Sequence, residues 1–194
     1  MKKSLLNTWP ALLSLSMGAA CAAPVTYIVD PSHTYPSFEA DHMGGLSVWR
    51  GKFNKNSGKI VMDRAASKGE LEIEVDMNSI DYGFELMNSK AKSDELFDTA
   101  KYPKAIYKGT LDGWTNGVPT KAVGVLTMHG VTKPLTLQIN SLKCIPHPML
   151  KRELCGADAQ ATLNRDDYGI SAGKDWGFDM AVTLRIQVEA VAAE

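Results

Sequence analysis

The chain has 194 residues, of which 21 are basic and 22 acidic, and 44% are hydrophobic. This nearly balanced charge gives no reason to expect nucleic acid or an anionic membrane surface as a partner. The length suits one domain with a substantial hydrophobic core, and we find no internal repeat, low-complexity tract or interdomain linker.

Residues 1–22 have the features of a secretory signal peptide. Two lysines precede a mostly apolar stretch, and Ala20-Cys21-Ala22 follows the small-x-small cleavage rule. Polar residues and a proline interrupt the stretch, which is too short for a membrane-spanning helix of about 20 apolar residues. Lipidation of Cys21 is disfavoured because Gly18 stands where a lipobox normally has a larger aliphatic residue. We expect an exported domain at residues 23–194.

Two cysteines remain after such a cleavage, Cys144 and Cys155. An even cysteine count in an oxidising compartment favours a disulfide, which would stabilise the fold by about 2–3 kcal/mol. A thiol metal site or redox site is the alternative, and the absence of a C-x-x-C motif disfavours it.

The dominant hydrophobic period is two, which is typical of β-strands with one apolar face. Unbroken alternation predicts strands at Leu71–Met77, Leu135–Asn140 and Val182–Glu189. Weaker candidates are Tyr27–Val29, Ser37–His42, Val48–Asn54, Lys59–Asp63, Ala105–Asp112, Lys121–Met128 and Gly156–Leu163. Glycine-containing turns separate these segments and predict antiparallel hairpins. Residues 85–97 have helix formers without glycine or proline and predict a short helix that ends before Tyr102-Pro103.

The apolar strand faces must be covered, which either a sandwich or a closed barrel achieves. Charged residues on the opposite faces, such as Glu72 and Glu74, exclude an outer-membrane barrel because they cannot face hydrocarbon. A barrel of about eight strands is wide enough to be filled by side chains or to hold one small ligand.

Five motifs follow one another along nearly the whole expected mature chain. They are YIVDPSH at 27–33 with Phe38 and His42, NSID at 78–81, FDTAKYP at 97–103, GVLTMHGVTKPL at 124–135 and LNRDDYGI at 163–170. Together they resemble the YceI-like family of polyisoprenoid-binding, lipocalin-like proteins of the bacterial periplasm.

The resemblance implies an all-β fold, an extended eight-stranded antiparallel lipocalin-like barrel with a short helical segment. It also implies a periplasmic location, a long apolar tunnel for a polyisoprenoid chain, as in quinones or polyprenols, and no catalytic residue. One departure concerns the helical segment, where relatives often have arginine, aspartate and histidine and this chain has Met87, Asn88 and Lys90. If those groups contact a ligand head in relatives, this chain is expected either to contact its ligand differently or to bind a different ligand.

Strand alternation assigns an inward face to the residues that we expect to contact a ligand. With motif residues added, these are Phe38, Ala40, His42, Trp49, Phe53, Ile73, Val75, Phe97, Tyr107, Leu126, Leu135, Leu137, Arg165 and Tyr168. The alternative is that such residues only fill a dry core. Ala40 and Gly51 favour a cavity because they leave room on the inward face.

Two polar features have alternative explanations. His42 is expected either to donate a hydrogen bond to a ligand or to be satisfied by a backbone carbonyl inside the core. Residues 165–167, Arg-Asp-Asp, form either a mouth for a head group or, as we prefer, a hydrogen-bonded turn at a strand end. The histidines are too far apart in sequence to predict a metal site, and no cofactor is expected.

Three functions are compatible with this sequence. The favoured one is a carrier or sequestering protein for an isoprenoid or other long-chain lipid, such as a fatty acid or fatty amide. An enzyme is disfavoured because no G-x-S-x-G or H-E-x-x-H motif is present. The third is an interaction scaffold without ligand. A homodimer is also compatible with the sequence.

Overall fold

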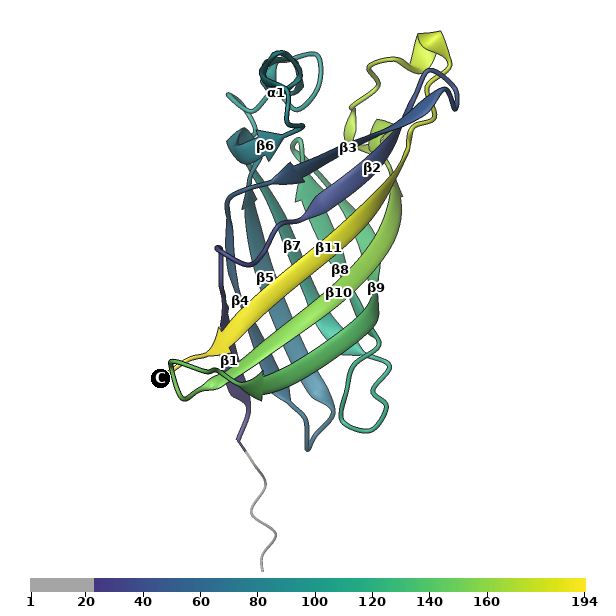
Figure 1. Cartoon of the computed structure of the whole chain (residues 1–194). Coiled ribbons are helices and arrows are strands. Elements are labelled where there is room, and N and C mark those ends of the chain that lie inside the picture. The colour runs from purple at the N-terminus through teal and green to yellow at the C-terminus, as the bar shows by residue number, and fades with distance from the viewer. Residues whose placement is uncertain (1–22) are drawn as a thin grey trace, which may run out of the picture.

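The computed structural model describes residues 23–194, so the expected signal peptide lies outside the described residues. Eight antiparallel strands form a closed barrel, in which β11 pairs with both β10 and β1 (Figure 1). In order around the barrel they are β1 (Val25–Val29), β4 (Asn56–Asp63), β5 (Lys68–Asp76), β7 (Lys104–Asp112), β8 (Lys121–Met128), β9 (Val131–Pro146), β10 (Glu153–Asn164) and β11 (Ala181–Ala192). The predicted eight-stranded barrel is confirmed.

Three further strands extend the wall at one end of the barrel. They are β2 (Ser37–His42), β3 (Ser47–Phe53) and β6 (Ile80–Asp81), and β2 pairs with the first half of β11. The second half of β11 pairs with β1 instead. Pro31 and Pro36 lie between β1 and β2, where each removes a backbone donor and interrupts the strand.

The helical segment caps the same end of the barrel, beside β6 (Figure 1). α1 spans Glu85–Lys92 and is shorter than the predicted helix at 85–97. After Ser93 the chain folds back, and the amide of Phe97 donates to the carbonyl of Ala91. Three short 3-10 turns complete the structure, η1 (Met77–Ser79), η2 (Arg165–Tyr168) and η3 (Lys174–Trp176). No helix within residues 23–194 has the length and apolar character that crossing a bilayer requires.

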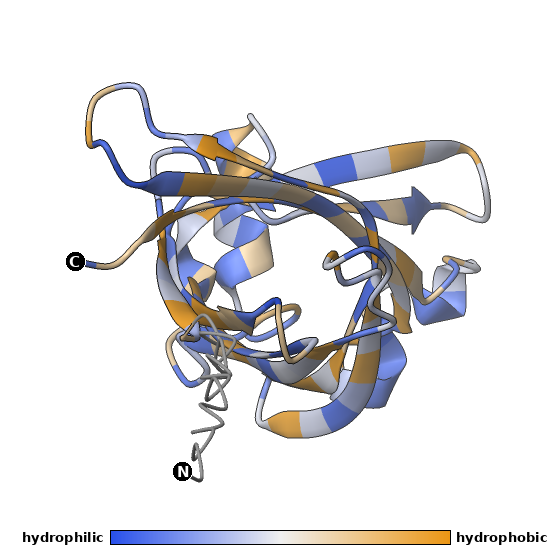
Figure 2. Ribbon diagram, turned by 90° about the horizontal axis from the view of Figure 1, so that it is seen from below, coloured by the Kyte–Doolittle hydropathy of each residue, from blue (hydrophilic) through white to orange (hydrophobic). Residues whose placement is uncertain are grey.

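Apolar and polar residues alternate along the strands, as the view along the barrel shows (Figure 2). On the outer face, Lys108 pairs with Glu72 at 3.0 Å and Lys104 with Glu74 at 2.8 Å across β5 and β7. Such exposed ion pairs contribute little stability. Burial of the inward apolar side chains therefore stabilises the fold, and these side chains also shape the interior.

Candidate functional site

The barrel interior is a cavity of about 460 Å³ rather than a fully packed core. This volume lies within the range of small-molecule binding sites. Among the residues expected to contact a ligand, those that line it are Phe38, Ala40, His42, Trp49, Phe53, Ile73, Val75, Phe97, Tyr107, Leu126, Leu135, Leu137 and Arg165. The geometry thus brings together thirteen side chains from distant parts of the sequence, and most of them are apolar.

Two expectations about the lining are not met. Tyr168 is 2% exposed but lies outside the lining, because the chain leaves β10 for the η2 turn before this residue. Its carbonyl accepts a hydrogen bond from Nδ1 of His129 at 2.8 Å. Gly51 leaves no free room, because an added Cβ would lie 2.6 Å from the Phe38 ring. Ala40 does line the cavity, as expected.

The cavity opens at the end of the barrel where α1 and η3 lie. Two of its lining residues there are exposed, Lys90 on α1 and Trp176 on η3, of which Trp176 is 78% exposed. None of the lining residues at the other end is exposed, and two of them, Tyr27 at 1% and Cys155 at 7%, are fully buried. We call the first end the mouth and the second end the floor.

Aromatic side chains surround the inner side of the mouth. The ring of His42 lies 4.9 Å from Trp49 and 5.1 Å from Phe178, measured between centroids. Among residues 23–194, no hydrogen bond to the His42 ring is found, so the alternative in which a backbone carbonyl satisfies this ring is not observed. Tyr82 packs edge-on against Phe38 at 5.6 Å. The mouth therefore offers ring faces to an apolar chain and an imidazole to a polar group.

Tyr82 and Arg165 are two partly buried polar residues that line the cavity near the mouth. Burial raises the pKa of Tyr82 to about 12 and lowers the pKa of Arg165. The guanidinium of Arg165 donates to the carbonyls of Ile170 at 2.9 Å and Ala172 at 2.6 Å. These bonds agree with the preferred interpretation of the Arg-Asp-Asp segment as a turn that holds a strand end, and Asp166 likewise accepts a bond from Ser171.

The altered helical segment contributes to the mouth in a mainly structural way. Met87 and Lys90 border the cavity, and Lys90 also forms an ion pair with Glu95. Asn88 is buried, and its side-chain oxygen accepts a hydrogen bond from the backbone amide of Tyr82 at 2.7 Å. Asn88 therefore fixes the position of Tyr82 instead of facing the cavity.

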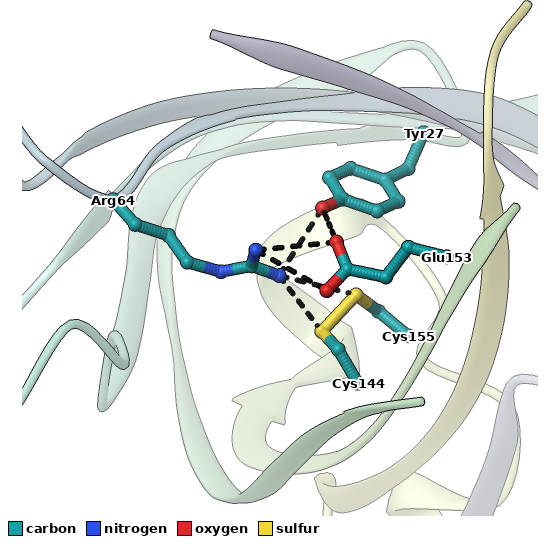
Figure 3. Close-up of a disulfide and its surroundings, with 5 residues drawn as sticks. All are labelled: Tyr27, Arg64, Cys144, Glu153 and Cys155. Atoms are coloured by element: carbon teal, nitrogen blue, oxygen red, sulfur yellow. Dashed lines mark hydrogen bonds and ion pairs between the residues drawn. A yellow bond between two sulfur atoms is a disulfide. The ribbon is translucent and has the colours of Figure 1, made fainter. Parts of the chain in front are cut away.

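At the floor, the structure pairs Cys144 with Cys155 in the expected disulfide (Figure 3). The two residues are direct partners across β9 and β10. The hydroxyl of Tyr27 donates to Glu153, and Arg64 Nη1 lies 3.2 Å from the same carboxylate. Burial and the bond to Glu153 raise the pKa of Tyr27 to about 12. We call these five residues the floor cluster.

Cys144, Glu153 and Cys155 are also the one group of potential metal ligands found close together in the described part of the chain. The two sulfur atoms are bonded to each other, so neither is a thiolate that could bind a metal. The guanidinium of Arg64 lies 2.9 Å from Cys144 Sγ and adds a positive charge that opposes a cation.

Comparison with known proteins identifies a family and a fold. A model of the YceI-like domain matches residues 27–190. A UPF0312 protein of Vibrio parahaemolyticus is 32% identical over 142 residues, which cover 71% of this chain and 73% of that protein. Protein YceI of Escherichia coli O157:H7 is 29% identical over 193 residues, which cover 98% of each chain.

Solved structures with the same fold are more distant in sequence. BcnA of Burkholderia cenocepacia superposes with a TM-score of 0.65 at 19% identity, over 83% of this chain and 98% of that one. A polyisoprenoid binding domain from Saccharophagus degradans gives 0.62 at 20% identity, over 86% and 98% of the two chains. At such identities the likeness establishes the barrel fold alone.

Proposed function

Because this chain belongs to the YceI-like domain family, we propose that it is a periplasmic protein that sequesters or carries a long-chain isoprenoid lipid in its barrel. The observation that carries the proposal is a cavity of about 460 Å³, lined almost wholly by apolar side chains, open at the mouth and closed at the floor. A structural neighbour described as a polyisoprenoid binding domain supports this class of ligand.

Burial of the chain supplies the binding energy. Each CH₂ group removed from water contributes about 0.8 kcal/mol, so several isoprene units offset the cost of association. Polar lining residues are few, and two of them already have partners, since Asp41 accepts backbone amides and Arg165 donates to carbonyls. The His42 ring has no hydrogen-bond partner among residues 23–194 and is left for a polar end of the ligand. We infer a ligand chosen by length and shape, and a protein that performs no chemistry on it.

The periplasmic location rests on the expected signal peptide at residues 1–22 and on the family resemblance. A disulfide between Cys144 and Cys155 suits an oxidising compartment. A homodimer stays a prediction, and light scattering of the purified protein measures it directly.

The proposal is tested by native mass spectrometry of the protein purified from the periplasm, followed by organic extraction. We expect one prenyl lipid per barrel in the wild type. Leu126→Trp, which fills the cavity, should abolish the bound lipid, whereas Val125→Trp on the outer face of the same strand should retain it.

Three outcomes decide the matter. A co-purified fatty acid or fatty amide would keep a long-chain ligand but replace the isoprenoid. A wild-type protein that stays empty after incubation with polyprenol would contradict lipid binding and leave the scaffold function. A lipid retained by Leu126→Trp would place the ligand outside the barrel.

A further inference from the structure

We propose that the floor cluster sets the greatest length of apolar chain that the barrel accepts, and that the ligand enters with its apolar end first. This inference rests on the proposed function, because it concerns the same cavity. It assigns a selective role to five residues, Tyr27, Arg64, Cys144, Glu153 and Cys155, at the end of the barrel opposite α1 (Figures 1 and 3).

The inner layer of the floor cluster is apolar. Tyr27 and Cys155 line the cavity and are 1% and 7% exposed. The Tyr27 hydroxyl is bound to Glu153, and the Cys155 sulfur is bound to Cys144. The surface that meets the end of a ligand is therefore an aromatic ring and a disulfide sulfur, which suit a terminal methyl group.

The outer layer is charged and borders solvent. The side chains of Arg64 and Glu153 are 38% and 36% exposed, and neither lines the cavity. Arg64 Nη2 lies 3.1 Å from the Tyr27 hydroxyl, and its Nη1 contacts both carboxylate oxygens at 3.2 and 3.4 Å. Since these groups satisfy one another, a polar head group gains no partner at the floor, whereas His42 at the mouth has no hydrogen bond from the described residues.

The floor cluster also connects two neighbouring pairs of strands at this end of the barrel, β1 with β4 and β9 with β10. Tyr27 belongs to β1, Arg64 follows β4, and the disulfide joins β9 to β10. Arg64 Nη2 reaches across to both sulfur atoms, at 2.9 Å from Cys144 and 3.4 Å from Cys155. A longer chain would have to break this ionic and covalent closure before it could pass.

Such a closure predicts that affinity rises with the chain length of the ligand only up to a limit, which we call the break. Each added CH₂ that enters the cavity raises affinity about fourfold, the equivalent of about 0.8 kcal/mol. Once the chain end reaches Tyr27, further groups stay in water at the mouth and add nothing. The affinity of the wild type for a homologous series of straight-chain primary alcohols should therefore rise and then level off.

The experiment measures this series by competition against a bound polyprenol for three proteins. The double variant Tyr27→Ala/Glu153→Ala removes the ring and the carboxylate and leaves Arg64 free to turn into solvent. In this variant the affinity should level off at a longer alcohol than in the wild type. Phe53→Ala is the matched control, because it shortens a large lining side chain at the mouth end, 6.0 Å from the Phe97 ring. It should weaken the binding of every alcohol without changing the chain length at which the affinity levels off.

A second measurement on the wild type is independent of how well the variants fold. An alcohol with a diazirine on its terminal carbon should label the peptides that contain Tyr27 or Cys155. Labelling of residues 172–178 by this probe, or a break at the same length in wild type and double variant, would overturn the inference. A wild type that binds no alcohol and no polyprenol of any length would instead overturn the proposed function.

Discussion

At the scale of single residues, one hydroxyl inside the barrel joins three strands. Tyr107 on β7 places its hydroxyl 3.0 Å from the carbonyl of Ala122 and 3.1 Å from that of Leu135. Burial raises the pKa of Tyr107 to about 12, so the group remains a donor at neutral pH. Tyr107→Phe should lower the free energy of unfolding by about 1 kcal/mol. A urea titration measures this as a lower midpoint, and an unchanged midpoint would contradict the bond.

Residue positions were predictable where a strand fixes the side-chain direction. Alternation placed Phe53, Ile73 and Leu137 inward, and all three line the cavity, because successive strand side chains point to opposite faces. Tyr168 is expected in the site from its motif alone, and this expectation is not met, because Tyr168 follows the strand and lies outside the lining. Strand alternation gives no signal for the contact between Arg64 and Glu153. These residues lie 89 positions apart in the sequence and meet only when the barrel closes.

At the scale of elements, the pairing of β7 with β8 depends on two facing glycines, Gly109 and Gly124. A Cβ added at Gly124 would lie 2.1 Å from the carbonyl oxygen of Lys108 and 2.7 Å from Cα of Gly109, so the backbones would have to separate. We expect Gly124→Ala to destabilise the barrel by about 1–3 kcal/mol, as overpacking does. Thermal unfolding measures the loss.

The control for this substitution is the same change on another strand. A Cβ added at Gly156 on β10 would meet Cγ of Glu189 at 3.7 Å, which is ordinary contact. Gly156→Ala should therefore leave the unfolding temperature nearly unchanged. Equal losses in the two variants would show that glycine flexibility, rather than the close approach of two backbones, governs the effect.

Element ends were less predictable than element types, for a reason visible in β9. The predicted strand stopped at Asn140, but β9 continues to Pro146. The register with β10 shifts after the pair Asp158 and Ser141, so Asn140 is skipped. Ile139 faces the cavity before this bulge and Leu142 after it, which reverses the alternation that marks a strand.

At the scale of the whole molecule, the walls at the two ends of the barrel are held together by different interactions. The floor has a disulfide and an ion pair, whereas the mouth is completed by short ladders: β3 and β6 share two residue pairs, and β2 and β11 share four. Segments with few paired residues open at low free energy. The hairpin of β2 and β3 is therefore the part of the wall that should yield when a lipid enters.

Asp41 links this hairpin to Asp179, which precedes β11. Its carboxylate accepts the amides of Gly44 at 2.9 Å, Gly45 at 2.6 Å and Asp179 at 2.9 Å. These bonds, first of all the one from Asp179, hold the pKa of Asp41 below its usual value of 3.8. Asp41→Asn should lower the hydrogen-exchange protection of those three amides at pH 7 and leave the amides of β9 and β10 near the disulfide unchanged.

The pH dependence of this link follows from the direction of the shift. Because the folded-state pKa is depressed, the carboxylate contributes fully above pH 3.8 and loses its contribution as pH falls through the folded-state value. Protection of Gly44, Gly45 and Asp179 in the wild type should therefore fall toward that of Asp41→Asn only below pH 3.8. A difference between the two proteins that persists unchanged at lower pH would show that the charge of Asp41 does not hold this hairpin to Asp179.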